Sequence, residues 1–232
     1  MLITALHVWV NLMPRIARTI EEVDIVKQQI LDAAVKIIIN DGFYKLSMRK
    51  IASSIGVSAT TIYNYYTNKD ELYFYIRIRG FELLFQYLEK AYSKSTSPRE
   101  KFLGMMHGYV DFGLTYPDYY EIMFLNRNVP KFLDCVGTPL ENVASQEKAV
   151  ALKPFLFTIE KFKEHLGLED APAYELTMQL WVELNGLVSL CISRLIREVY
   201  EKQQQFIESY LDTIACRYLP VEMQDDVFSD EV

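Results

Sequence analysis

Cysteine, glycine and proline are scarce in this sequence. Its 232 residues include 3 cysteines, 9 glycines and 8 prolines. The cysteines are widely spaced and odd in number, so they form neither a disulfide framework nor a C-x-x-C zinc pattern, and the reducing cytoplasm suits them best. Half of the residues are hydrophobic, which excludes the collagen-like and disordered classes. We therefore expect a folded, soluble protein.

Other absences narrow the functional classes. No apolar run approaches the roughly 18 residues of a membrane-spanning helix, so we expect no membrane partner. The histidines (His7, His107 and His165) are scattered, and we expect no metal site and no cofactor. The sequence has no nucleophile–base spacing and no phosphate loop, which argues against an enzyme. A helical enzyme or ligand-sequestering protein, centred on His107 or Glu183 in an aromatic cavity, is the alternative.

Both ends of the chain are interpreted as separate from the two domains. Residues 1–20 are interpreted as an N-terminal extension. Their start, MLITALHVWVNLMP, lacks the basic region and the cleavage site of a secretion signal. We hypothesise that translation naturally begins at Met13. Residues 221–232 are expected to be an acidic, solvated tail.

The dominant pattern is helical. Apolar residues recur at helical spacing over 25–40 and 72–92, whereas the alternation typical of strands is rare. The fold class is therefore all-α.

The serine-rich stretch 93–97 is the clearest domain boundary, after which Ser97, Pro98 and Glu100 start a new helix. Further helices are expected at 102–114, at 118–126, at 140–166 with a bend at Pro154, from Pro172 to about Tyr200 with Asp170 as cap, and up to Tyr218.

The segment that follows Ser47 predicts a helix-turn-helix. Ser47 can cap a helix, Gly56 supplies a tight turn, and Ser58 can cap a second short helix that reaches Tyr66. In this motif the first residues of the second helix meet base edges in the major groove. Small residues there allow close approach, and threonine methyl groups suit thymine. Lys69, at the start of the next helix, is expected to bind a DNA phosphate.

Three segments carry a resemblance: MRKIA at 48–52, GVSATTIYNYY at 56–66 and KDEL at 69–72. Together with the preceding helix they resemble the DNA-binding domain of TetR-family transcriptional regulators. Tyr65 and Tyr66 stand where that family often has His and Phe, and Thr60 stands where it often has Gly. The resemblance therefore implies DNA binding but no particular base preference.

The resemblance also implies a domain organisation and residue roles. A three-helix DNA-binding domain at 21–70 would join a larger helical ligand-binding and dimerisation domain at 71–220. By position, Ser47, Tyr63 and Lys69 would hold phosphates, and Thr60, Thr61 and Tyr65 would face bases or the adjacent backbone. The candidate DNA-binding residues are Ser47, Arg49, Ser58, Ala59, Thr60, Thr61, Tyr63, Tyr65 and Lys69.

The charge divides between the two halves. The net charge is -7, which by itself argues against a nucleic-acid partner. However, residues 1–79 hold ten basic and seven acidic residues, a net +3, and residues 80–232 hold 14 and 24, a net -10. Phosphate binding depends on local charge, because salt screens charges beyond roughly 8 Å. The N-terminal part can therefore bind DNA.

The C-terminal part is rich in aromatic residues and methionine. Such side chains, converging between helices, make apolar ligand pockets. Segments 116–124 and 181–190 also resemble a C-terminal subclass of the same family, in which His is usual at the position of Asn185. The candidate ligand-binding residues are Met105, Tyr109, Phe112, Tyr120, Phe124, Trp181 and Asn185.

The resemblance finally implies a homodimer formed by the last two long helices as a four-helix bundle. The expected interface residues are Leu184, Leu187, Val188, Cys191, Leu195, Ile207, Leu211 and Ile214. The hypothesis is a cytoplasmic repressor that binds a palindromic double-stranded DNA operator and is released by a small apolar or amphipathic effector. A DNA-organising protein without an effector is a further alternative.

Overall fold

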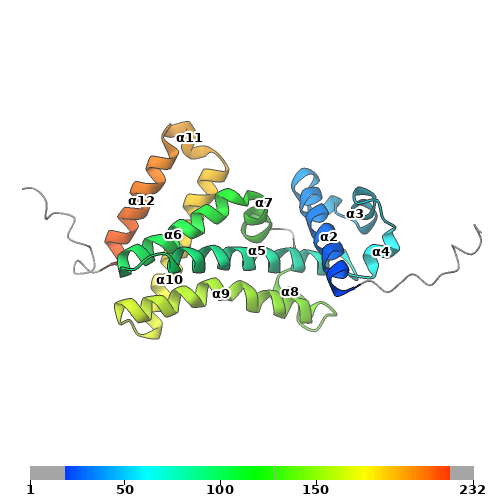
Figure 1. The fold of residues 1–232 in the computed structure, drawn as a ribbon, viewed down its shortest axis with the longest axis horizontal. Helices are drawn as coiled ribbons and strands as arrows, with labels where there is room; N and C mark the ends of the chain where they lie inside the picture. Colours follow the sequence, from blue (N-terminus) through cyan, green and yellow to red (C-terminus); the bar gives the residue numbers. More distant parts are fainter. Residues whose placement is uncertain (1–18, 128, 220–232) are drawn as a thin grey trace, which may run out of the picture.

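The structure is a computed structural model that describes residues 19–127 and 129–219. Every regular element in these ranges is a helix, which confirms the expected all-α fold. The molecule is elongated, with short N-terminal helices at one end, C-terminal helices at the other, and one long helix running between them (Figure 1). The expectations for the extension, the Met13 start and the acidic tail fall outside the described residues, apart from Thr19 and Ile20.

The N-terminal group consists of α2 (Ile20–Asp41), the 3-10 turn η1 (Phe43–Lys45), α3 (Met48–Ser54) and α4 (Ala59–Tyr63). α2 begins before the expected residue 25 because Thr19 and Glu22 form a capping box, in which each side chain accepts from the backbone N–H of the other. The helix ends at Gly42, whose φ of 84° favours glycine. α4 is shorter than expected.

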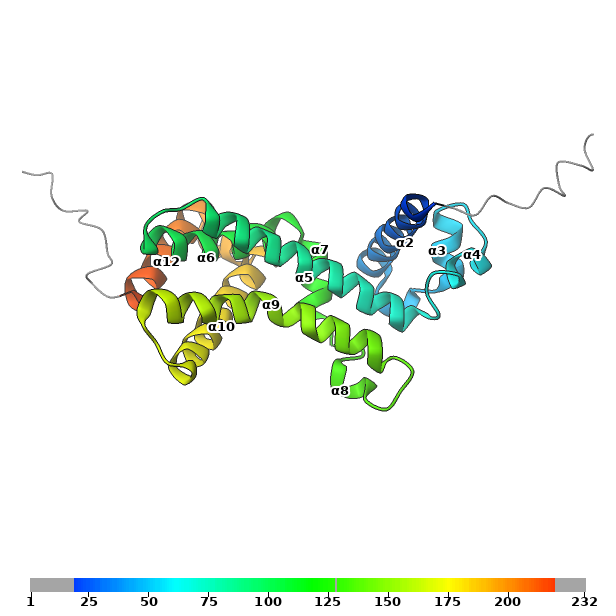
Figure 2. The ribbon, with the colours of Figure 1, turned by 60° about the horizontal axis from the view of Figure 1, so that its bottom comes forward.

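The long helix is α5 (Lys69–Ser93). It begins where the side chain of Asn68 accepts from the N–H groups of Asp70 and Glu71. Its first turns pack on α2, and the rest packs along α6 (Pro98–Thr115) and α9 (Glu141–Leu166) (Figure 2). The stretch 93–97 is therefore a turn between two packed helices, so the boundary expected there is wrong, although Ser97 and Glu100 do form the expected capping box. The division near residue 70 stays a prediction.

The other C-terminal elements are α7 (Pro117–Tyr120), the π-helix η2 (Glu121–Leu125), α8 (Phe132–Cys135), α10 (Asp170–Ile192), α11 (Leu195–Val199) and α12 (Gln203–Tyr218). The helix expected to reach Tyr200 is interrupted, because Arg194 has a left-handed backbone with φ 65°. Asp170 does not cap α10; it is the first helical residue and pairs with Lys163. Pro154 lies inside α9.

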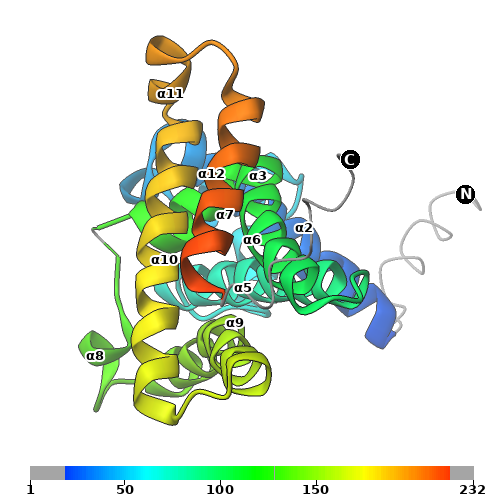
Figure 3. The same cartoon turned by 90° about the vertical axis from the view of Figure 1, so that its left-hand side faces the viewer.

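Most of the apolar residues expected at a dimer interface are buried inside the protomer. α10 and α12 both pack on α6, as the end-on view shows (Figure 3). Seven of the eight expected interface residues are buried by these contacts within one chain, and only Leu195 is exposed. The assignment is wrong for those seven, because a stripe at helical spacing identifies a buried face but not which chain buries it. The seven buried residues are Leu184, Leu187, Val188, Cys191, Ile207, Leu211 and Ile214.

Candidate DNA-binding and ligand-binding sites

The helix-turn-helix consists of α3 and α4. The Ser47 side chain accepts from the Lys50 N–H at 3.2 Å, and the Ser58 side chain accepts from the Thr61 N–H at 3.1 Å, so both predicted caps are confirmed. Between the helices Gly56 has φ 69°, a conformation that favours glycine. These local interactions fix where each short helix begins and how the chain turns between them.

Buried apolar residues hold the two helices together. Ile51 and Ile62 are fully buried, and Tyr66 is 3% exposed, which confirms their expected place in the core. Ile62 lies in the middle of α4, so its burial turns the opposite face of that helix outward. The orientation of the second helix is thus set by a single anchoring side chain and its neighbours.

Most of the candidate DNA-binding residues lie on the outward face of α4 and on the neighbouring surface of α3. Arg49, Ser58 and Thr60 are exposed, and Tyr63 has 55% of its surface exposed. The Thr61 hydroxyl forms a 2.9 Å hydrogen bond with the Ser58 hydroxyl. Because the Ser58 oxygen also accepts from the Thr61 N–H, the Thr61 hydroxyl is the one that keeps a free lone pair whichever of the two donates. Ser47 is also exposed, while Ala59, Thr61, Tyr65 and Lys69 are half-buried.

Lys69 is held in place by an aromatic ring. Its ammonium lies 4.7 Å from the centre of the Phe43 ring, within the range of a cation–π contact. Lys69 is the first residue of α5, so its charge and the first N–H groups of this helix lie together. This combination suits a phosphate, because helix N-termini attract anions.

Ion pairs tie α2 to its neighbours. Lys50 Nζ lies 2.5 Å from Asp41 Oδ2 and keeps the pKa of that carboxyl below its ordinary value. Arg79 of α5 pairs with Asp32 of α2 at 2.6 Å. The second pair adds an ion pair to the packing of the long helix on α2.

Four aromatic residues form a cluster between α6, α7–η2 and α10. Phe124 lies at its centre, with ring centroids 4.9 Å from Tyr120, 6.4 Å from Tyr109 and 6.4 Å from Trp181. We call Tyr109, Tyr120, Phe124 and Trp181 the aromatic cluster. The structure therefore brings together four of the seven candidate ligand-binding residues.

Two phenols give this cluster a polar side. The Tyr120 hydroxyl donates to Asn185 Oδ1 at 2.7 Å, which brings a fifth candidate to the cluster. The Tyr109 hydroxyl is buried and has no hydrogen-bond partner among the described residues. Burial, reinforced by Tyr120, raises the pKa of Tyr109, so this phenol stays neutral and able to donate.

The other two candidate ligand-binding residues, Phe112 and Met105, lie outside the aromatic cluster. Phe112 is fully buried, but its ring packs on Tyr87 and Tyr116, at 6.1 and 5.9 Å. Met105 is buried. These contacts are those of core residues, and ligand binding by either residue stays a prediction.

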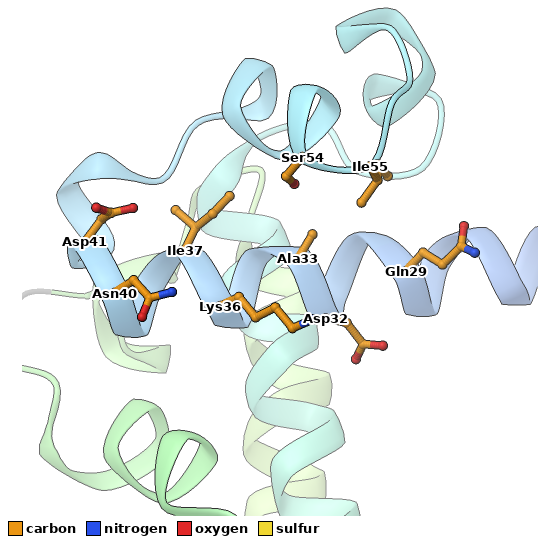
Figure 4. A pocket seen from close by; sticks show the side chains of 9 residues that line it. All are labelled: Gln29, Asp32, Ala33, Lys36, Ile37, Asn40, Asp41, Ser54 and Ile55. Atoms are coloured by element: carbon orange, nitrogen blue, oxygen red, sulfur yellow. The ribbon is translucent and has the colours of Figure 1, made fainter.

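An open groove of about 480 Å³ lies in the N-terminal domain, between α2 and the end of α3 (Figure 4). None of the candidate ligand-binding residues lines it. Its lining mixes charged, amide and aliphatic side chains, namely Gln29, Asp32, Ala33, Lys36, Ile37, Asn40, Asp41, Ser54 and Ile55.

Within residues 19–127 and 129–219, His, Cys, Asp and Glu form no group that could hold a metal ion. In the same part of the chain no helix has the length and apolar character needed to cross a membrane.

Two family models match the chain. The model described as bacterial regulatory proteins, tetR family, matches residues 30–76, and the Tetracyclin repressor-like, C-terminal domain matches residues 102–214. The chain belongs to the TetR family of transcriptional regulators. It is a DNA-binding regulator with a helix-turn-helix domain.

Named relatives of this TetR-family regulator agree with the assignment. An uncharacterized HTH-type transcriptional regulator from Haemophilus influenzae is 28% identical over 163 residues, which are 70% of this chain and 76% of the relative. The HTH-type regulator YobS from Bacillus subtilis is 24% identical over 181 residues, 72% of this chain and 94% of its own.

Solved structures share the fold. A protein of unknown function from Rhodococcus sp. RHA1 has a TM-score of 0.68 at 18% identity, covering 88% of this chain and 98% of its own. The fatty acid degradation regulator FadR from Bacillus halodurans has a TM-score of 0.61 at 15% identity, covering 82% and 94%. At these identities the likeness shows the fold alone.

The structure adds an exposed aromatic residue to the TetR-family DNA-binding domain. Tyr44 is 73% exposed, while the adjacent Phe43 is 7% exposed. Both lie in η1, between α2 and α3, and Lys45 beside them is also exposed. The sequence did not single out Tyr44, because two adjacent aromatic residues carry no signal of which one faces solvent.

Proposed function

We propose that this TetR-family regulator is a homodimeric cytoplasmic repressor, which binds a palindromic operator and is released by a small apolar or amphipathic effector. The observation that carries the proposal is the orientation of α4: buried Ile62 turns Thr60 and Tyr63 outward. That arrangement presents hydroxyls and a phenol to the major groove. No disulfide joins the three cysteines, which is in keeping with a reducing compartment.

In the proposed complex seven of the nine candidate residues have a distinct role. Thr60, Thr61 and Tyr65 face bases or the adjacent backbone, whereas Ser47, Tyr63 and Lys69 hold phosphates. Arg49 projects from α3 toward the same duplex. Tyr44 is proposed as a further backbone contact, because its exposed phenol lies in η1, just ahead of the Ser47 cap.

The proposed dimer uses the outward face of α10. Val182 is 65% exposed and Leu190 is 45% exposed on this face, although both are apolar. Gly186 lies between them, and a Cβ atom added there would meet nothing within 4 Å. The space above this glycine allows a partner helix to approach closely. A two-fold dimer formed in this way suits a palindromic operator.

The proposed effector binds at the aromatic cluster. Tyr109 offers a buried hydroxyl there that forms no hydrogen bond of normal geometry with the described residues, and an effector with a polar atom would satisfy it. Phe124 belongs to η2, and η2 packs on α5. An effector that binds one arrangement of η2 more tightly would shift α5, and with it the separation of the two recognition helices.

Fluorescence anisotropy with a palindromic fragment of the adjacent promoter tests the proposal. Wild-type protein should bind the fragment specifically and lose affinity as salt rises. A Tyr63→Ala/Lys69→Ala variant should bind at least about tenfold more weakly, the loss expected for removed hydrogen bonds to a charged group. The control is Lys94→Ala, which removes a charge just after the other end of α5.

Two results would contradict the proposal. One is the absence of specific, salt-sensitive binding by the wild type. The other is equal affinity of the double variant and the control, with unchanged melting temperatures. A parallel screen for substrate turnover separates this function from the enzyme alternative.

A further inference from the structure

Arg77 and Glu147 form a buried ion pair between α5 and α9. Arg77 Nη2 lies 2.9 Å from Glu147 Oε1, and the two side chains are only 9% and 4% exposed. Arg77 is close to the start of α5, so the pair lies near the N-terminal domain. Charged groups are rarely buried to this extent unless they are paired and hydrogen-bonded.

The hydrogen-bonding capacity of the Arg77–Glu147 pair is not fully used. Arg77 Nε and Nη1 have no hydrogen-bond partner among the described residues, and the contact at Glu147 Oε1 lacks hydrogen-bond geometry. Buried polar atoms in folded proteins nearly always have partners. Two unused N–H donors on a buried guanidinium therefore indicate that an acceptor from outside the chain can bind here.

A second cation faces the same pair. Lys131 precedes α8 and is half-buried. Its pKa is lowered, because burial and the charge of Arg77 outweigh the opposite effect of the Glu147 and Asp134 carboxylates. Asp134 is exposed, so solvent screens its charge. Arg77 pairs directly with Glu147, and the charge of Lys131 acts on the same carboxylate without forming an ion pair with it. The neighbouring Tyr73 phenol is already used, because it donates to the Ile122 carbonyl at 2.6 Å.

An aromatic path leads from this pair to the aromatic cluster. Arg77 Cζ lies 5.7 Å from the centre of the Phe81 ring, and the Phe81 ring lies 5.6 Å from that of Phe124 in an edge-to-face contact. Phe124 is the centre of the cluster. The Arg77–Glu147 pair and the aromatic cluster are therefore connected by a continuous series of contacts through Phe81.

We propose that Arg77, supported by Lys131, binds the carboxylate of an amphipathic organic acid, whose apolar body lies along Phe81 and Phe124. The proposal rests on the effector site of the proposed function and names the chemical class of the effector. The carboxylate accepts from the unused Nε–H of Arg77 and, in a two-donor fork, from Nη2, which in the structure pairs with Glu147. It also competes with Glu147 for Arg77, so binding bears directly on the contact between α5 and α9.

Matched pairs of compounds test this assignment on the full-length protein without DNA. The probes are decanoate with decanamide, and 3-phenylpropionate with 3-phenylpropanamide, each titrated by calorimetry and by its effect on the melting temperature. We expect at least one carboxylate to bind about tenfold or more tightly than its amide, the ratio for a charge-assisted hydrogen bond. No preference for either carboxylate over its amide overturns the assignment, whether or not the amides bind.

Variants locate the preference. Arg77→Gln/Glu147→Gln removes both charges of the pair and should abolish the preference for the carboxylate. Lys131→Gln leaves the pair intact and should reduce the preference without affecting the fold. The control Arg99→Gln removes an arginine whose partner is Asp212, at 3.0 Å on α12, and should keep the full preference. Retention of the preference by both site variants overturns the assignment.

The test is independent of the repressor hypothesis. Operator binding is measured separately by anisotropy, so its absence contradicts the proposed function while the carboxylate titrations still report on Arg77. Conversely, normal operator binding with no carboxylate preference contradicts only the effector class.

Discussion

Gly80 of α5 and Met123 of η2 lie in direct contact. A Cβ atom at Gly80 would be 2.4 Å from Met123 Sδ and 3.0 Å from Tyr119 Cδ1. Only a residue without a side chain allows η2 to come this close to α5. Because Phe124 follows Met123 in η2, this contact joins the aromatic cluster to the helix that carries Lys69 at its start.

Gly80→Ala should lower the free energy of unfolding by about 1–3 kcal/mol, the usual cost of overpacking a core. With Met123→Ala in the same chain the combined loss should be smaller than the sum of the two single losses, since the clashing sulfur is gone. Urea denaturation of the wild type, both single variants and the double variant measures this. Effects that simply add, within about 0.5 kcal/mol, would show that the two residues do not interact.

Lys69→Gln should weaken operator binding and reduce its dependence on salt. Each lost phosphate contact lowers the slope of log affinity against log salt by about 0.9. Lys94→Gln, at the opposite end of α5, should leave the slope unchanged. Equal slopes for the two variants, measured by anisotropy over a salt series, would remove Lys69 from the DNA contacts.

Tyr218→Phe should reduce the loss of stability at alkaline pH. Burial and the hydrogen bond to Glu183, at 2.7 Å, raise the pKa of Tyr218 from 10.0 to about 12. Because the folded-state pKa is the higher one, the stabilisation is complete below pH 10 and is lost as the pH rises toward 12. The difference in unfolding free energy between wild type and variant should therefore shrink over this interval. Tyr44→Phe, at an exposed phenol, is the control, and parallel curves for Tyr218→Phe and wild type would refute the linkage.

Val182→Glu should dissociate the proposed dimer. A carboxylate on the outward face of α10 would be buried without a partner at the interface, which is costly. Sedimentation velocity should show a shift toward monomer, and operator affinity should fall with it. Leu133→Glu tests a different surface, since Leu133 lies on α8 and is 80% exposed. A dimer that survives Val182→Glu and dissociates with Leu133→Glu would place the interface elsewhere.

The sequence by itself determined where several helices of this protein begin. Ser47, Ser58 and Ser97 start helices where the sequence predicts them, because a cap depends only on a side chain and the next two or three N–H groups. The same local chemistry, with Gly56 at the turn, defined the helix-turn-helix. Its likeness to the TetR family was therefore visible before the fold was known.

Only the tertiary structure decided which surfaces these helices share. The stripe through Leu187 and Val188 was visible in the sequence, but its burial within one chain depends on the packing of α10 and α12 on α6. Likewise, Arg77 and Glu147 are 70 positions apart in the sequence and meet only because α5 and α9 lie side by side. Helical periodicity identifies a face that is buried, whereas the partner of that face depends on contacts between distant segments, which no local pattern encodes.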